Sequence, residues 1–237
     1  MPRVVPNVPA ETDLLCEYCG YTLNGLPPGG NCPECGTPIE SSTSPDIRQP
    51  SAWERDRAFF TTTDEAIFHP SRFFRETITR GNLPAAQRFG AIHTAIAAAL
   101  FAGAGILHLC FELGGAIAPL AAAIGWLGLA LATLTLLTMT TRIAALLTTW
   151  EATYRGYRLP LPVVQRALAF HAAHYLPVAL AALFTTAGYQ IALAFNPNFA
   201  IHGIAYLEVL SGEVVLGAIY LFNTYWIAMR KMMYANY

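Results

Sequence analysis

Three long stretches of the chain contain no charged residue, and they determine the architecture that the sequence predicts. Residues 89–111, 113–141 and 167–207 lack Asp, Glu, Lys and Arg altogether. A bilayer core about 30 Å thick needs roughly 20 such residues per helix. Helices formed by these stretches are apolar or small on every side, whereas a helix of a soluble bundle needs a polar face. The pattern predicts a mainly α protein, a multi-span helical membrane bundle.

Turn signals bound the three transmembrane helices of these stretches, and a fourth, which contains Glu208 and Glu213, follows them. Pro119 is suited to the first turn of the second helix, and Asn-Pro-Asn at 196–198 ends the third. The second helix is expected to stop near Gly156, and Pro177 is expected to kink the third. The four spans are predicted at about residues 89–111, 118–141, 167–195 and 206–229.

Two Cys-x-x-Cys pairs near the start of the chain are the strongest chemical signal. They comprise Cys16, Cys19, Cys32 and Cys35. Four thiolates at this spacing match tetrahedral zinc in a closed site, which leaves no position open for a substrate. We therefore predict one structural zinc ion per chain, which supplies most of the folding free energy of so small a ribbon. Two alternatives stay open: two disulfides, or iron bound as in rubredoxin. Cys110 stands alone in an apolar run and is expected to be buried.

The segments around the ribbon differ from it and from the spans. Residues 37–60 are polar and rich in proline, which predicts a flexible tether. In residues 63–80, Phe and Ile alternate with Arg, which fits either a helix lying on anionic headgroups or a helix packed against the bundle. We expect a disordered N-terminus at 1–13, a zinc ribbon at 14–40, a flexible linker at 41–62, a juxtamembrane amphipathic segment at 63–87 and the transmembrane domain at 88–237.

Charge placement predicts the orientation of the protein. Arg and Lys lie before the first span, between the second and third, and after the fourth, while the two other loops have none. By the positive-inside rule both termini are cytoplasmic, and the thiolates need the same reducing compartment. We expect a multi-pass protein of the cytoplasmic membrane. Only 12% of the residues are charged and the net charge is −1, so no nucleic-acid partner is expected.

Ionisable residues inside the predicted spans are the remaining candidate sites. Glu213 is the best of them, as an interhelical hydrogen-bonding group or a proton carrier, whereas Glu208 is interfacial if the helix begins later. His171, His174 and His93 could form a three-histidine cluster, although histidines in membranes more often hydrogen-bond between helices. The sequence has no nucleophile elbow, phosphate loop, dinucleotide fingerprint or HExxH motif, so we expect no enzymatic activity.

Two parts of the sequence resemble known proteins. The first knuckle with its GYTLNGLP and CPECG, within residues 14–40, resembles the short zinc ribbons that open many uncharacterised bacterial membrane proteins. HPSRFFRETI at 69–78 and the basic loop YRGYRLPLPVVQRALAFHAAHYLPV resemble the Ypt-interacting protein (Yip) family. That resemblance implies a membrane scaffold or trafficking-type adaptor without catalytic residues.

The expected function is therefore a non-catalytic scaffold or adaptor. Its partners would be the lipid bilayer and a protein that binds the zinc ribbon, and self-association into a homo-oligomer stays open. The alternative is a small transporter or channel component that uses Glu213. A redox carrier that uses the cysteines or histidines is a third, weaker hypothesis.

Overall fold

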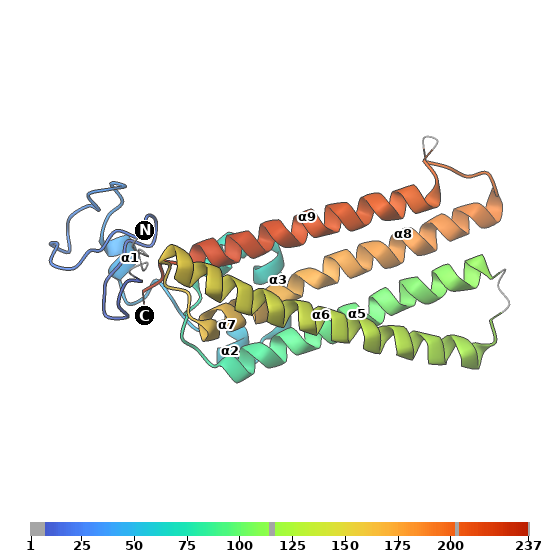
Figure 1. Ribbon diagram of the computed structural model, residues 1–237, viewed down its shortest axis with the longest axis horizontal. Coiled ribbons are helices and arrows are strands. Elements are labelled where there is room, and N and C mark those ends of the chain that lie inside the picture. The colour runs from blue at the N-terminus through green and yellow to red at the C-terminus, as the bar shows by residue number, and fades with distance from the viewer. Residues whose placement is uncertain (1–7, 114–116, 202–203, 237) are drawn as a thin grey trace, which may run out of the picture. The chain divides into compact units, whose positions relative to one another are not determined.

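The computed structural model describes residues 8–113, 117–201 and 204–236, and the protein is mainly α (Figure 1). By length and composition, four helical stretches are able to cross a membrane, which confirms the predicted number of spans and makes the chain a multi-pass membrane protein. They are α5 (Leu83–Glu112), α6 (Pro119–Arg155), the stretch Leu161–Phe195, and α9 (Tyr206–Met232). Pro119 opens α6, and Gly156, with φ of +77°, follows its last residue, as predicted. The two loops without Arg or Lys include residues 114–116 and 202–203, which lie outside the described residues.

The third span is interrupted earlier than expected. It consists of α7 (Leu161–His171), a 3₁₀ turn η1 (Ala172–His174) and α8 (Tyr175–Phe195). Pro177 lies in the first turn of α8, so the irregular geometry precedes it. Proline lacks an N–H and its ring clashes with the carbonyl four residues earlier, here Ala173 of η1. Pro177 therefore accounts for the 3₁₀ turn at Ala172–His174, which lies about one helical turn before it.

The segment expected to be a flexible linker, 41–62, is largely structured. It carries the end of α1 (Glu40–Thr43), all of α2 (Ala52–Asp56) and the start of α3 (Phe59–Phe68). Ser51 and Glu54 form a reciprocal capping box at the start of α2. Trp53 Nε1 donates a hydrogen bond to Ala85 O at 2.7 Å, which fastens α2 to α5. The proline-rich composition concealed these local signals.

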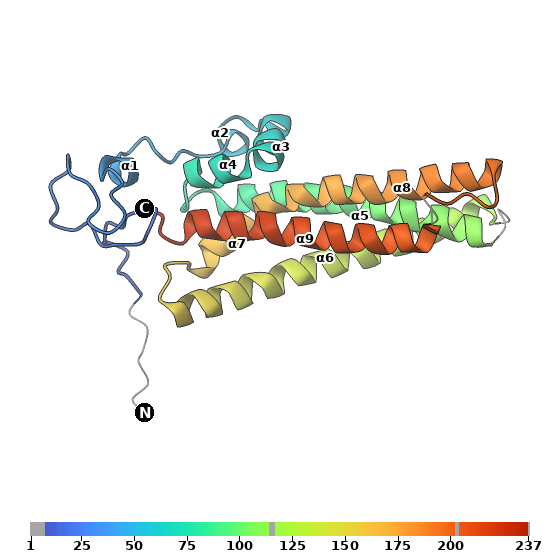
Figure 2. The ribbon, with the colours of Figure 1, turned by 90° about the horizontal axis from the view of Figure 1, so that it is seen from above.

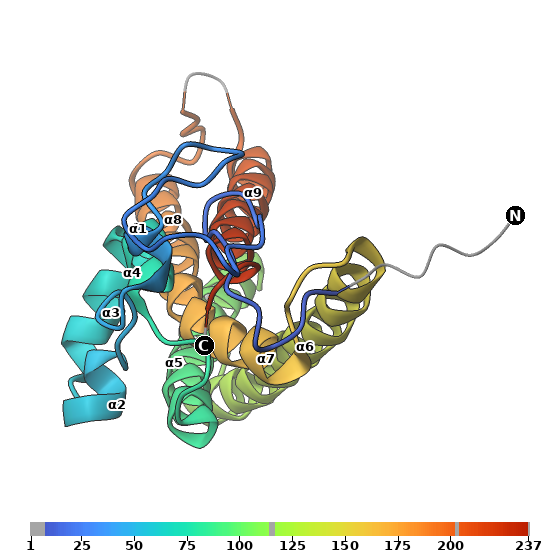
Figure 3. The same cartoon turned by 90° about the vertical axis from the view of Figure 1, so that its left-hand side faces the viewer.

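The amphipathic segment forms two short helices rather than one. α3 ends at Phe68 and α4 (Pro70–Glu76) begins at a proline, because the residue before proline is disfavoured in helical geometry. α2, α3 and α4 lie beside one another (Figures 2 and 3). Phe73 and Phe74 of α4 are buried, which favours the packed alternative for α4, whereas Phe68 is exposed.

The chain divides into two compact units. The first comprises Met1–Gly90, Thr141–His171 and Thr224–Tyr237, of which residues 1–7 and 237 are not described. Its interior holds a cluster of aromatic rings with centroids 5.2–6.0 Å apart, formed by Trp53, Phe59, Phe73, Phe74, Phe89 and Phe170. Beside Phe170 lies a buried ion pair between Arg166 and Glu54.

The second unit comprises Ala91–Thr140 and Ala172–Asn223. α8 and α9 run side by side in opposite directions (Figures 1 and 2). A Cβ atom at Gly217 would lie 2.9 Å from Val178 Cγ1, so glycine at this position lets the two helices approach closely. Trp126 Nε1 of α6 donates to Ala99 O of α5 at 3.1 Å. Large apolar side chains are exposed on the outside of this unit, where a bilayer would cover them: Leu120, Ile124, Leu131, Leu136, Phe184, Val214, Leu216 and Ile219.

Candidate metal centre

The two cysteine pairs are built on the same turn. Cys16 O accepts a hydrogen bond from Gly20 N at 2.8 Å, and Cys32 O accepts one from Gly36 N at 2.9 Å. Gly20 and Gly36 have φ of +80° and +72°, a backbone conformation that side chains with a Cβ rarely adopt. The glycine after each pair therefore permits the turn that directs both sulfurs of the pair to one side.

The four predicted ligands come together as one cluster. The sulfur atoms of Cys16, Cys19, Cys32 and Cys35 all lie within 4.8 Å of one another. Two of the separations join the two turns: 3.5 Å from Cys16 to Cys35 and 3.6 Å from Cys19 to Cys32. Four sulfurs about 2.3 Å from a tetrahedral zinc lie about 3.8 Å apart, so the cluster has the size that such an ion needs.

The structure does not favour the disulfide alternative. All five cysteines are free thiols, and sulfurs of different Cys-x-x-Cys pairs lie 3.5 and 3.6 Å apart, well beyond the length of an S–S bond. Cys110, expected to be buried, is half-buried on α5. Zinc and iron both accept four thiolates, so the four-cysteine cluster fits either ion.

The thiols of the cluster differ in their surroundings and in their acidity. Cys16 and Cys32 are buried with Leu23 and Ile39 in a small apolar core, while Cys35 is exposed. In the metal-free cluster, burial raises the pKa of Cys16, and burial raises the pKa of Cys19 to about 12. Hydrogen bonds from the side chain and backbone of Thr37 lower the pKa of Cys35 to about 6. Cys35 is therefore the ligand most readily deprotonated.

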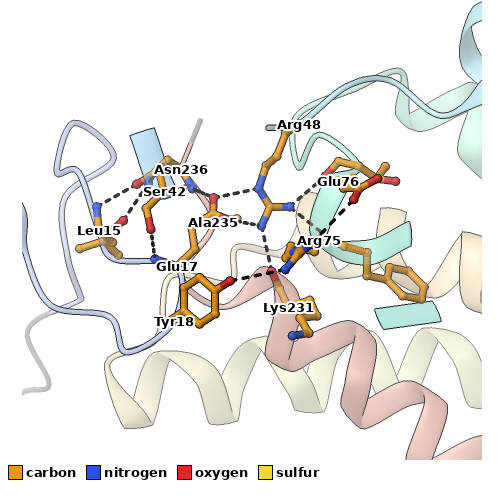
Figure 4. Close-up of polar contacts among 12 residues, drawn as sticks. Leu15, Glu17, Tyr18, Ser42, Arg48, Arg75, Glu76, Lys231, Ala235 and Asn236 are labelled. Atoms are coloured by element: carbon orange, nitrogen blue, oxygen red, sulfur yellow. Dashed lines mark hydrogen bonds and ion pairs between the residues drawn. The ribbon is translucent and has the colours of Figure 1, made fainter. Parts of the chain in front are cut away.

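An arginine from the supposed linker fixes the first turn of the ribbon in place (Figure 4). Arg48 Nε and Nη2 each donate to Glu17, both at 2.9 Å, in a two-point contact that is almost fully buried. The same guanidinium donates to Thr77 O at 2.9 Å and to Lys231 O at 3.0 Å. Arg48 thus joins the ribbon to residues that follow α4 and to the end of α9.

A second set of contacts involves residues after α9. Asn236 Nδ2 donates to Leu15 O at 2.8 Å and to Ser42 O at 2.6 Å, and Leu15 N donates to Asn236 Oδ1 at 2.8 Å. Arg158 donates to Ala235 O at 2.8 Å, and also to the carbonyls of Ala10 and Asp13, at 2.9 and 2.7 Å.

These contacts correct two expectations from the sequence. Within the expected disordered N-terminus, residues 8–13 are held by Arg158, while residues 1–7 lie outside the described residues. The ribbon is bound to the rest of its unit rather than tethered by a loose segment. Sequence reasoning missed Glu17, Arg48 and Asn236 as residues that position the site.

The candidate residues in the spans do not form a second metal site. Within residues 8–113, 117–201 and 204–236, the four cysteines are the only group of His, Cys, Asp and Glu side chains that could hold a metal ion. His171 Nε2 lies 2.9 Å from Thr224 Oγ1, and His174 Nδ1 lies 2.7 Å from Tyr220 OH. Both histidines therefore hydrogen-bond to α9, the commoner role for histidines in membranes.

The two glutamates of α9 differ in their surroundings. Glu208 Oε2 accepts the N–H of Ala205 at 2.9 Å and lies in the first turn of α9, which begins at Tyr206, where the fourth span was predicted to begin. Both carboxylate oxygens of Glu213 are shut off from solvent and have no hydrogen-bond partner in the part of the chain that the structure describes. Of the two glutamates, Glu213 is therefore the one whose buried carboxylate is left without a hydrogen bond among the described residues.

Comparison with known proteins does not assign the chain to a family. No family model, no curated protein and no solved structure matches the chain. The resemblance to the Ypt-interacting protein family therefore gains no support from these comparisons, and the four-cysteine cluster and the four apolar helices stand as the features that describe the protein.

Proposed function

We propose that the chain is a non-catalytic membrane scaffold or adaptor with a structural zinc ion in its ribbon. The observation that carries this proposal is the cluster of four cysteine sulfurs within 4.8 Å of one another. Four protein ligands complete a tetrahedral site, so a bound ion has no position left for a substrate. The ion would fix the fold of the ribbon, and the ribbon would offer a surface at the end of the membrane helices.

The proposed orientation places both termini in the cytoplasm of a cell. It rests on the distribution of Arg and Lys around the four spans and on the reducing conditions that free thiols require. Arg158 and Arg166 are buried, so they have structural roles of their own. The exposed Arg142 and Arg155, in the C-terminal part of α6, are the more informative residues for orientation.

The proposed partner is a protein that binds the exposed aromatic side of the ribbon. Leu23 and Leu26 are taken up by the small core around the cysteines. Tyr18 and Tyr21 are 54% and 37% exposed, and aromatic side chains of this kind anchor protein interfaces. The ribbon therefore keeps an apolar surface that its own core does not use.

Affinity purification from native membranes in mild detergent tests this proposal. We expect a specific protein to copurify with the wild-type chain and to be lost from a variant that carries both Tyr18→Ser and Tyr21→Ser. Tyr154→Ser, at an exposed tyrosine of α6, is the matched control and should retain it. An adaptor role through the ribbon is wrong if the double variant and the control recover the same proteins.

Glu213 supports a second candidate function, a small transporter or channel component. A carboxylate in a membrane span is costly to bury, and that of Glu213 has no hydrogen-bond partner among the described residues to offset this cost. Reconstituted vesicles under a proton or Na⁺ gradient should show a flux that Glu213→Gln removes and Glu208→Gln preserves. The absence of any flux above that of empty vesicles would rule this function out.

A further inference from the structure

The backbone of Leu15, at an edge of the ribbon, is hydrogen-bonded by the side chain of Asn236, which follows α9. On the inner side, the turn around Leu15 is closed by backbone bonds from Cys16 N to Tyr21 O and from Leu23 N to Leu14 O. The N–H and C=O of Leu15 itself point the other way and both bond to the side-chain amide of Asn236. An amide side chain offers the same donor and acceptor as a peptide group. Asn236 therefore satisfies an edge that would otherwise be unpaired.

Two arginines with buried side chains hold this arrangement. Arg158 Nη2 donates to Ala235 O and to Asn236 Oδ1, at 2.8 and 3.1 Å, while its Nη1 binds the segment that leads into the ribbon. Arg48 binds Glu17 of the ribbon and Lys231 O at the end of α9 at the same time. Glu17 Oε1 also accepts the N–H of Asn236 at 3.0 Å. Arg158 thus joins the ribbon side to the residues after α9, and Arg48 joins the ribbon to the last turn of α9.

An aromatic ring from the same segment packs on the first cysteine turn. A Cβ atom at Gly20 would lie 2.5 Å from Cε1 of Tyr234, so the ring rests against the backbone that follows Cys19. The packing of Tyr234 therefore requires the folded turn around Cys16 and Cys19 as well as the absence of a side chain at Gly20. The segment formed by residues 231–236 is here named the latch. Its contacts with the ribbon include Leu15, Glu17 and Gly20, each next to a cysteine, and it also binds Ser42.

We propose that metal loading of the ribbon controls the docking of the latch, so that the metal-bound ribbon holds the end of α9 and removal of the metal frees it. This inference rests on the metal site proposed above. A ribbon of this size cannot build a sufficient core without its ion, so it loses its fold when the ion is removed. Loss of the fold displaces Leu15, Glu17 and Gly20 together, and with them the contacts that dock the latch.

Amide hydrogen exchange on the full-length protein in detergent tests the inference, with metal content measured by elemental analysis in parallel. In the zinc-loaded protein, the amides of residues 233–236 should be protected. Stripping the metal with a chelator should speed their exchange by about tenfold or more, because several hydrogen bonds open together. Restoring zinc should restore the protection.

Substitution of the latch separates its docking from metal binding. Asn236→Ala should keep its metal and lose most of the protection, while Asn198→Ala, at an exposed asparagine remote in sequence, should keep both. A protein that binds no metal would disprove the proposed metal site itself. A protein that binds metal but shows equal exchange in the latch with and without it would overturn the coupling, as would an Asn236→Ala variant as protected as the wild type.

Discussion

Arg166 and Glu54 form an ion pair that is closed off from solvent although 112 residues separate them in the chain. Their side chains are 2% and 3% exposed, and Arg166 Nη2 lies 2.5 Å from Glu54 Oε2. A Cβ atom at Gly81 would lie 2.7 Å from atoms of both side chains, so the glycine leaves the space that the pair occupies. A buried charge that loses its partner is far more costly than an exposed one.

Glu54→Gln should therefore destabilise the protein by about 3–5 kcal/mol, since it leaves the guanidinium of Arg166 buried without a counterion. Glutamine keeps the ability to form the capping box with Ser51, so the loss reports on the charge. Thermal unfolding in detergent measures the effect. Glu76→Gln removes the partner of Arg72 in an exposed i,i+4 pair and should cost about 0.5 kcal/mol or less. Equal shifts for both variants would contradict this account.

The metal content of the purified protein should be one zinc ion per chain. Cys32→Ser should abolish it, because Cys32 supplies one of four sulfurs in a site that has no substitute ligand among the described residues. Elemental analysis provides the measurement, and Cys110→Ser is the control that should retain the ion. Iron in place of zinc, with visible absorbance from iron–thiolate charge transfer, would show that the site is of the rubredoxin kind.

Cys35 should be the first ribbon thiol to react with iodoacetamide when the reagent and a chelator are added together, as the ion leaves and before the ribbon loses its fold. Its pKa of about 6 keeps it a thiolate at pH 7, whereas burial keeps Cys19, with a pKa of about 12, a thiol. The rate at Cys35 should fall as the pH drops through about 6 and level off above about pH 7. Thr37→Val should move this profile towards higher pH, since it removes a hydrogen bond that stabilises the thiolate. Mass spectrometry of the alkylated peptides, in a Cys110→Ser background, gives the site and the rate. A Cys35 profile that still rises between pH 7 and 9 in the unsubstituted ribbon would disagree with this assignment.

Membrane topology should follow the distribution of arginine. A cysteine at Thr153, near the end of α6, should react with an impermeant thiol reagent only from the cytoplasmic side. A cysteine at Asn198, between α8 and α9, should react only from the opposite side. Labelling of both positions from the same side would show that the number of spans between them is even.

The four spans and the cysteine cluster could be predicted from the sequence because each is encoded by a short stretch of the chain. Charge-free stretches predict the first three helices, a largely apolar stretch predicts the fourth, and Pro119 and Gly156 set the limits of α6. The spacing of Cys16 and Cys19, repeated at Cys32 and Cys35, carries the ligand set without reference to the rest of the fold.

The contacts that position the ribbon could not be obtained in this way. Arg48 meets Lys231 across 183 residues, Arg158 meets Ala10 across 148, and no local pattern records either contact. Polar composition suggested a loose linker, although the Ser51–Glu54 capping box was present in the sequence as evidence for a helix. Arg166 is one of the arginines between the second and third predicted spans that predicted the orientation of the protein. Its burial beside Glu54 depends on the tertiary fold, which the residues around Arg166 in the sequence do not specify.

The contact between Leu15 and Asn236 joins two parts of the chain that a ribosome makes at different times. They are 221 residues apart, and at about 5–20 residues per second the interval between them is roughly 10 to 45 s. All four spans are synthesised within that interval. Metal capture by the ribbon and insertion of the spans can therefore both precede the pairing of Leu15, and a ribbon with a completed edge marks a chain that has been translated through residue 236.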